Sequence, residues 1–262
     1  MKKELRIFFT ALMFLTRLPV PRFTDHSPEY LEKASKYFPL IGWVVAAIST
    51  AAFVLFYKLA TIELACLASI TAGILTTGAF HEDGFADVCD AFGGGWSKEQ
   101  ILDIMKDSRL GTFGVVGLLL ILTAKFLLLK ECGNMLLGQE QGVYVFTATL
   151  IIAHAYSRFM AVVAIQISGY VFEQAKTKSK PMAASRLNLT QFATAATFAL
   201  LPFFFLPMVT LVVIVPMLLA MFLMVRYFNK WIGGYTGDCL GSIQQVTEVV
   251  CYLSLLVLWR FT

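Results

Sequence analysis

The sequence predicts an all-α protein, a polytopic integral membrane bundle. Of its 262 residues, 58% are hydrophobic and only 15% are charged, and the mean hydropathy is +0.73. Soluble domains are about 45–50% apolar and roughly 25% charged. A spanning helix needs about 20 mostly apolar residues, so the apolar runs leave room for about seven spans with short loops. Residues 1–262 are therefore expected to form a single transmembrane catalytic domain.

The expected spans follow the apolar runs in chain order. They are 38–57, 60–80, 113–130, 142–168, 189–206, 208–226 and 239–259. An earlier apolar segment, 7–15, is short for a span and is flanked by Arg6 and Arg17. We expect it to be an N-terminal helix that lies at the interface or re-enters the membrane. Pro207 suits a tight turn between two spans, and Pro216 is expected to kink a helix.

Basic residues are distributed unevenly between the two sides of the expected bundle. If the spans alternate in direction, one side carries the loops 17–37, 81–112, 169–188 and 226–238. These loops hold thirteen Lys and Arg residues, against three in the loops of the other side. The positive-inside rule makes the basic side cytoplasmic. We therefore expect a multi-pass protein of the cell inner membrane, with short cytoplasmic helices that carry the site.

The stretch HEDGFADVCD, residues 81–90, places four carboxylates directly after an apolar run. In a helix, Asp83, Asp87 and Asp90 fall at i, i+4 and i+7 and share one face. Carboxylates this close raise one another's pKa values, and a cation removes the conflict. Oxygen ligands without Cys or His at coordinating spacing suit Mg²⁺ or Mn²⁺ better than Zn²⁺. The pattern predicts a metal site, with Gly84 letting a phosphate approach the backbone.

A second acidic helix is expected after a glycine break at 93–95. Ser97 starts it, with Gln100 three residues on in a capping-box pattern. Its charged side chains are Asp103, Lys106, Asp107 and, at its end, Arg109. We expect this helix to lie on the membrane surface, so that the two acidic helices hold a metal and a diphosphate between them, with the basic side chains near phosphate oxygens. A solvated face is the alternative interpretation, and it fits Asp103 best.

Ionisable residues also occur within later spans, where they are functional hypotheses by default. His154 and Arg158 stand at i, i+4, and the alternative to a function is that they snorkel or pair with a carboxylate. Asp238, in GGYTGDCLG, is expected either to cap the last span or to belong to a second part of the site. Glu248 lies deeper in that helix and needs a partner, for which Lys125 and Arg158 are the candidates.

The motifs together carry a resemblance to a known family. GAFHEDGFADVCDAF followed by IMKDSRLGTFG resembles the signature of the cobalamin synthase family, whose members are adenosylcobinamide-GDP ribazoletransferases. FLTRLPVP, FPLIG and GGYTGDCLG are similar to the family's other landmarks, in the same order, so the resemblance covers nearly the whole chain. The chain departs from the family at Glu82 and Phe85, where members often carry Leu, and at Gln245, where an acid is common.

The resemblance implies a Mg²⁺-dependent transferase, for which Mn²⁺ is a substitute. It would join adenosylcobinamide-GDP to α-ribazole or its 5′-phosphate and release GMP, a ribose hydroxyl attacking the cobinamide-linked phosphorus. The catalytic residues would be His81, Asp83, Asp87 and Asp107, with His81 or a carboxylate taking the hydroxyl proton. The metal ligands would be Asp83, Asp87, Asp90 and Asp107. The residues that bind substrate or phosphate would be Gly84, Lys106, Arg109, Arg158 and Asp238.

Other partners and functions follow from the same features. The lipid bilayer is an expected partner, a homo-oligomer is left open because membrane assemblies are common, and no nucleic-acid partner is expected. One alternative is a CDP-alcohol phosphotransferase, but Asp87 stands where that motif carries Arg. The other is a cation-coupled transporter, which predicts acids in the middle of spans and an internal repeat. Here most acids cluster in one loop.

Overall fold

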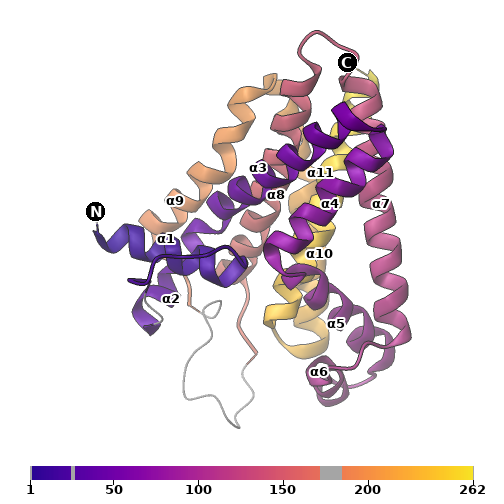
Figure 1. The fold of residues 1–262 in the computed structure, drawn as a ribbon. Coiled ribbons are helices and arrows are strands. Elements are labelled where there is room, and N and C mark those ends of the chain that lie inside the picture. Colours follow the sequence, from indigo (N-terminus) through magenta and orange to yellow (C-terminus); the bar gives the residue numbers. More distant parts are fainter. Residues whose placement is uncertain (1, 25–26, 172–184, 262) are drawn as a thin grey trace.

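The computed structural model describes residues 2–24, 27–171 and 185–261, and helices make up its architecture (Figure 1). The α-helices are α1 (Lys2–Leu15), α2 (Pro28–Ala34), α3 (Phe38–Leu59), α4 (Ile62–Thr77), α5 (Phe80–Gly94), α6 (Lys98–Lys106), α7 (Thr112–Leu136), α8 (Gly142–Ile167), α9 (Leu189–Leu200), α10 (Ile214–Ile232) and α11 (Gly237–Phe261). Short 3₁₀ segments are η1 (Ser35–Tyr37), η3 (Leu201–Phe205) and η4 (Met208–Val213). The expected all-α bundle is therefore confirmed.

Five helical stretches within the described residues are long and apolar enough to cross a membrane. They are Glu29–Leu59, Thr112–Leu136, Gly142–Ile167, Met208–Ile232 and Gly237–Phe261. The expected span 60–80 reaches this length only when α4 and α5 are counted as one bent pair. The expected span 189–206 forms the shorter apolar helix Leu189–Phe205. By length and composition the bundle thus holds five or six spans, against about seven expected.

Helix α8 forms the centre of the bundle. Its most span-like window is 89% buried, whereas that of α7 is only 17% buried, so α7 lies on the outside of the bundle. Helices α3 and α11 pack against α8. The approach of α3 is close because a Cβ on Gly42 would lie 2.5 Å from the backbone oxygen of His154. Small residues at such contacts let membrane helices pack tightly.

The chain bends sharply between α4 and α5. The expected span 60–80 ends directly before the carboxylate stretch, and in the structure the helices on either side of this boundary meet at 89°. Gly78 and Ala79 both adopt left-handed backbone angles, with φ values of 67° and 59°, and a right-handed helix cannot pass through such residues. Because α5 carries four carboxylates after this bend, we place α5 at the membrane surface. The expected i, i+4, i+7 face survives, since α5 contains all three aspartates.

The basic loops gather at one end of the bundle. Figure 1 shows α5, α6 and the turn from α10 to α11 at the lower end, opposite the C-terminus and the turn from α7 to α8. Ser97 caps α6 as expected, because its hydroxyl accepts a hydrogen bond from Gln100 N. The apolar side of α6 is buried through Ile101, Leu102 and Met105. Residues 172–184, which include Lys176, Lys178 and Lys180 of the charge argument, lie outside the described part of the chain.

Candidate functional site

The site is built where α5 packs against α11. A Cβ on Gly84 would lie 2.9 Å from Asp238 Cα, and one on Gly241 would lie 3.3 Å from the backbone oxygen of His81. Glycine at both positions therefore lets the two helices touch. Gly84 was predicted to admit a phosphate, but its open side is filled by the first turn of α11. The contact brings the carboxylates of α5 to Asp238.

Three carboxylates converge at this contact. Asp83 is exposed, whereas Asp87 and Asp238 are half-buried. Burial, and then the charges of Asp238, Asp83 and Asp90, raise the pKa of Asp87 to about 6. Mutual repulsion of this kind is what a bound cation relieves. The structure thus brings Asp83, Asp87 and Asp238 together. Asp83 and Asp87 were predicted as metal ligands, and Asp238 was predicted to bind substrate or phosphate.

The carboxylates at the contact between α5 and α11 are the candidate ligands for Mg²⁺. Among the residues that the structure describes, no group of three or more His, Cys, Asp and Glu side chains is arranged to hold a metal ion. Mg²⁺ is usually held by one or two carboxylates together with waters and substrate phosphates. The donors at this contact are carboxylates, the ligand type that Mg²⁺ prefers, but within the described residues they do not form a complete metal site by themselves.

Asp90 has a structural task of its own. Its Oδ2 accepts a hydrogen bond from Gly111 N at 2.7 Å, and its Oδ1 accepts one from Gly114 N at 2.8 Å. A carboxylate at this place satisfies unpaired N–H groups and interacts favourably with the helix dipole. Asp90 therefore fixes the start of α7 on α5. Its predicted role as a metal ligand stays a prediction.

The charged residues of α6 form surface pairs. Arg109 Nε donates to Asp107 Oδ1 at 3.0 Å, and this guanidinium lowers the pKa of Asp107 to about 2. Lys106 lies 3.7 Å from Asp103. The structure thus pairs Asp107 with Arg109 and Lys106 with Asp103, and the predicted roles of Asp107, Lys106 and Arg109 stay predictions.

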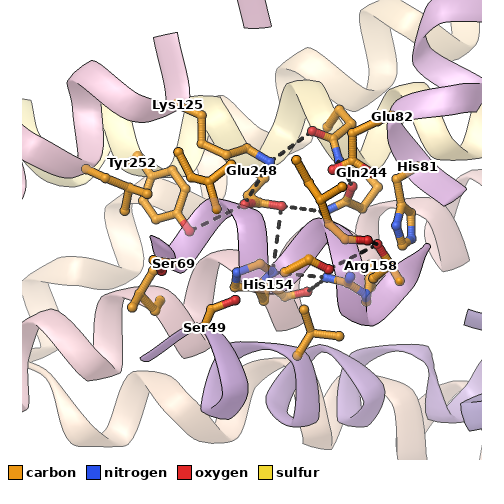
Figure 2. A pocket seen from close by; sticks show the side chains of 18 residues that line it. Ser49, Ser69, His81, Glu82, Lys125, His154, Arg158, Gln244, Glu248 and Tyr252 are labelled. Atoms are coloured by element: carbon orange, nitrogen blue, oxygen red, sulfur yellow. Dashed lines mark hydrogen bonds and ion pairs between the residues drawn. The ribbon is translucent and has the colours of Figure 1, made fainter. Parts of the chain in front are cut away.

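A second polar cluster lies inside the bundle, around a cavity of about 380 Å³ (Figure 2). We name it the core network. Its members are Glu82, Lys125, His154, Arg158, Gln244, Gln245, Glu248 and Tyr252. Lys125 Nζ lies 3.2 Å from Glu248 Oε1 and donates to Gln245 Oε1 at 2.9 Å. Gln244 Nε2 donates to the other Glu248 oxygen at 2.6 Å. Glu248 was expected to need a partner, and of the two candidates, Lys125 and Arg158, Lys125 forms the ion pair.

The core network also reaches α5. Gln245 Nε2 donates to Glu82 Oε1 at 3.0 Å, so two of the three positions at which the chain departs from the family pattern contact each other. This link fixes α5 to α11 directly beside Asp83. We did not predict it from the sequence, although an uncompensated Lys125 in an apolar run was a signal that polar partners lie nearby.

Arg158 and His81 face the interior, away from the carboxylates. Arg158 Nη1 donates to the backbone oxygen of His154 at 2.9 Å, but its Nε has no hydrogen-bond partner within the described part of the chain. His81 is buried, and it lines the same cavity as Arg158 and Glu248. Figure 2 shows Arg158 beside His81. The structure therefore places these two predicted residues with the core network.

The chain was compared with known proteins. The family model described as cobalamin-5-phosphate synthase matches residues 7–256. A protein from Leptospira interrogans named adenosylcobinamide-GDP ribazoletransferase is 41% identical over 268 residues, which cover 99% of this chain and 98% of the relative. Proteins of the same name from Shewanella piezotolerans and Shewanella amazonensis are each 40% identical over 259 residues, covering 98% of this chain and 96% and 97% of those relatives. No solved structure matches the chain.

Proposed function

Because this chain belongs to the cobalamin-5-phosphate synthase family, we infer that it joins adenosylcobinamide-GDP to α-ribazole, or to α-ribazole 5′-phosphate, with release of GMP. It is a transferase of cobalamin synthesis embedded in a membrane by its apolar helices. The structural observation that supports this reaction best is the convergence of Asp83, Asp87 and Asp238 at the contact between α5 and α11. Such a cluster suits a substrate whose reacting group is a diphosphate.

We propose that Asp83 and Asp87 hold a Mg²⁺ ion, for which Mn²⁺ can substitute, with Asp238 facing them from α11. A bound Mg²⁺ would offset negative charge on the phosphate oxygens. Asp90 keeps α7 against α5 through its two backbone hydrogen bonds, and Glu82 keeps α5 against α11 through Gln245. These contacts hold the carboxylates in place before substrate arrives, which avoids reorganisation during the reaction.

The attacking ribose hydroxyl must also lose a proton. We propose that a carboxylate of this site, and not His81, accepts it. His81 lies on the interior side of α5 with Arg158 and Glu248, whereas Asp83, Asp87 and Asp238 lie at the contact between α5 and α11 where the diphosphate would bind. A base must lie within hydrogen-bond reach of the hydroxyl whose proton it accepts.

The reaction itself can be tested directly. We expect the purified protein, incubated with adenosylcobinamide-GDP, α-ribazole and Mg²⁺, to release GMP and form adenosylcobalamin in equal amounts, as followed by liquid chromatography. α-Ribazole 5′-phosphate should give the 5′-phosphate of the product. CDP-diacylglycerol with an alcohol acceptor serves as the control for a lipid enzyme. Release of CMP from that substrate, and no GMP from the first, would contradict the proposed function.

We further propose that the site faces the cytoplasm in the cell inner membrane. The support is the charge asymmetry, because the described parts of the basic loops lie at the end of the bundle that carries α5 and α6 (Figure 1). In a Cys89→Ser background, Trp96→Cys should react with a membrane-impermeant maleimide in inside-out vesicles only. Gly138→Cys, in the turn before α8, should react in right-side-out vesicles only. The reverse pattern would contradict this orientation.

A further inference from the structure

A second cavity lies beside the contact between α5 and α11, outside the carboxylate site. It encloses about 410 Å³, part of which is open to solvent. Most of its wall is apolar and comes from α1, α3, α5, α8 and α11. These residues are Phe14, Leu15, Phe38, Phe80, Ala161 and Leu240. The cavity therefore suits a compact apolar group.

Aromatic rings shape one side of this cavity. The Phe14 ring is nearly parallel to that of Phe38, with centroids 6.2 Å apart and planes at 7°. It meets Phe80 edge to face at 5.2 Å. Phe14 and Phe80 remain 36% and 39% exposed, so part of this surface can still be covered. Offset and edge-to-face contacts with such rings favour a flat aromatic guest over a flexible chain.

One buried donor in the wall lacks an acceptor. Arg158 is only 3% exposed, it lies between this cavity and that of the core network and lines both, and its Nε–H has no partner among the described residues. An unsatisfied buried donor costs about 1–3 kcal/mol, and more when it is charged. A guest with a ring-nitrogen lone pair would remove that cost. The cavity thus combines an apolar aromatic wall with a demand for one acceptor.

We propose that this cavity binds the benzimidazole base of α-ribazole, whose unsubstituted ring nitrogen accepts a hydrogen bond from Arg158 Nε. The inference rests on the proposed function and names the place of one substrate within it. Benzimidazole is flat and apolar and carries one such nitrogen. Gly237 also lines the cavity and directly precedes Asp238, so the ribose attached to a base bound there would lie next to the carboxylates.

The other parts of the substrates fit this cavity less well. Guanine carries several donors and acceptors on its edges. The polar side chains of this wall are His81, Arg158 and Gln244. The Gln244 amide already bonds to Glu248 and Gln245, so most of the guanine edge would stay unpaired. A corrin ring with its adenosyl group is too large for about 410 Å³. The Arg158 side chain, which we predicted to bind phosphate, is assigned by this geometry to the base instead.

The test fills the cavity and leaves the carboxylates unchanged. In Ala161→Leu the extra volume should occupy the base subsite, and in Phe80→Leu the aromatic face is removed while apolar volume is kept. We expect each variant to raise the KM for α-ribazole by about tenfold or more, with the KM for adenosylcobinamide-GDP unchanged. Ser49→Ala, which alters the neighbouring cavity of the core network, is the matched control and should change neither. Equal thermal midpoints check that all variants fold.

Equilibrium binding separates this inference from the proposed function. Labelled α-ribazole is titrated onto detergent-purified protein in the absence of adenosylcobinamide-GDP, with free benzimidazole as competitor. Weaker binding to Ala161→Leu than to Ser49→Ala, together with competition by benzimidazole, supports the subsite whether or not GMP release is observed. Equal binding to all the proteins, or a rise only in the KM for adenosylcobinamide-GDP, overturns the subsite. If the unsubstituted protein releases no GMP, that result contradicts the proposed function but not the subsite.

Discussion

Asp83→Asn and Asp87→Asn are each expected to lower the rate of GMP release by about 100- to 1,000-fold, a loss typical of removing one group that stabilises charge in a transition state. Each change keeps the size of the side chain and removes one negative charge from the contact between α5 and α11. Without that charge, a divalent cation is held less firmly against the diphosphate. The measurement is the initial rate of GMP release across a titration with Mg²⁺ and, separately, with Mn²⁺.

The control for this pair is Asp103→Asn. Asp103 belongs to the same acidic stretch, but it is exposed on α6 and lies 3.7 Å from Lys106. Its loss should change the rate by less than about twofold, because exposed ion pairs contribute little. Near-normal rates in both Asp83→Asn and Asp87→Asn would refute the assignment of these residues to the metal site.

Glu248→Leu is expected to destabilise the protein strongly, by about 3–5 kcal/mol, because it leaves Lys125 as an uncompensated charge inside the bundle. The two groups lie 3.2 Å apart, and their side chains are only 2% and 7% exposed. Removing both charges in Lys125→Met with Glu248→Leu should recover a large part of the loss. The measurement is unfolding in mixed detergent micelles with increasing denaturant.

The exposed pair of Lys130 and Glu63 offers a matched comparison. Its atoms are 2.9 Å apart, but the side chains are 30% and 46% exposed. Lys130→Met should therefore be far less destabilising than Glu248→Leu, because exposed ion pairs contribute little. If Glu248→Leu is no more destabilising than Lys130→Met, or if the double variant is less stable than Glu248→Leu alone, the core network does not act as a buried ion pair.

Local pattern was enough to predict one face of the site. The spacing of Asp83, Asp87 and Asp90 depends only on helical periodicity. The three residues therefore share one face of α5, although a bend of 89° separates α5 from α4. Ser97 was recognisable as a cap because capping is a short-range interaction between a side chain and a backbone N–H two or three residues away. The pairing of Glu248 with Lys125 followed from the high cost of an isolated charge in the membrane.

The rest depended on tertiary contacts that no local pattern reveals. At the bend after α4, Ala79 adopts a left-handed conformation that favours glycine. Because alanine rarely adopts this conformation, the residue at position 79 does not predict the bend. Glu82 and Gln245 are 163 residues apart in the chain. The direction of His81 follows from the packing of α5 on α11, which turns His81 inward and Asp83 outward. Asp90 was predicted only as a metal ligand. Its hydrogen bonds to Gly111 N and Gly114 N at the start of α7 could not be predicted, because these residues belong to a different helix.

We have proposed that Asp83 and Asp87 of α5, with Asp238 of α11 opposite them, hold a divalent cation together with the substrate diphosphate. This assignment can be tested by the binding of Mn²⁺, followed by electron paramagnetic resonance in the presence of adenosylcobinamide-GDP. The Kd for Mn²⁺ should rise by about tenfold or more in Asp87→Asn, an energy of about 1.4 kcal/mol, and stay unchanged in Asp103→Asn. An unchanged Kd in Asp87→Asn, Asp83→Asn and Asp238→Asn alike would contradict the claim.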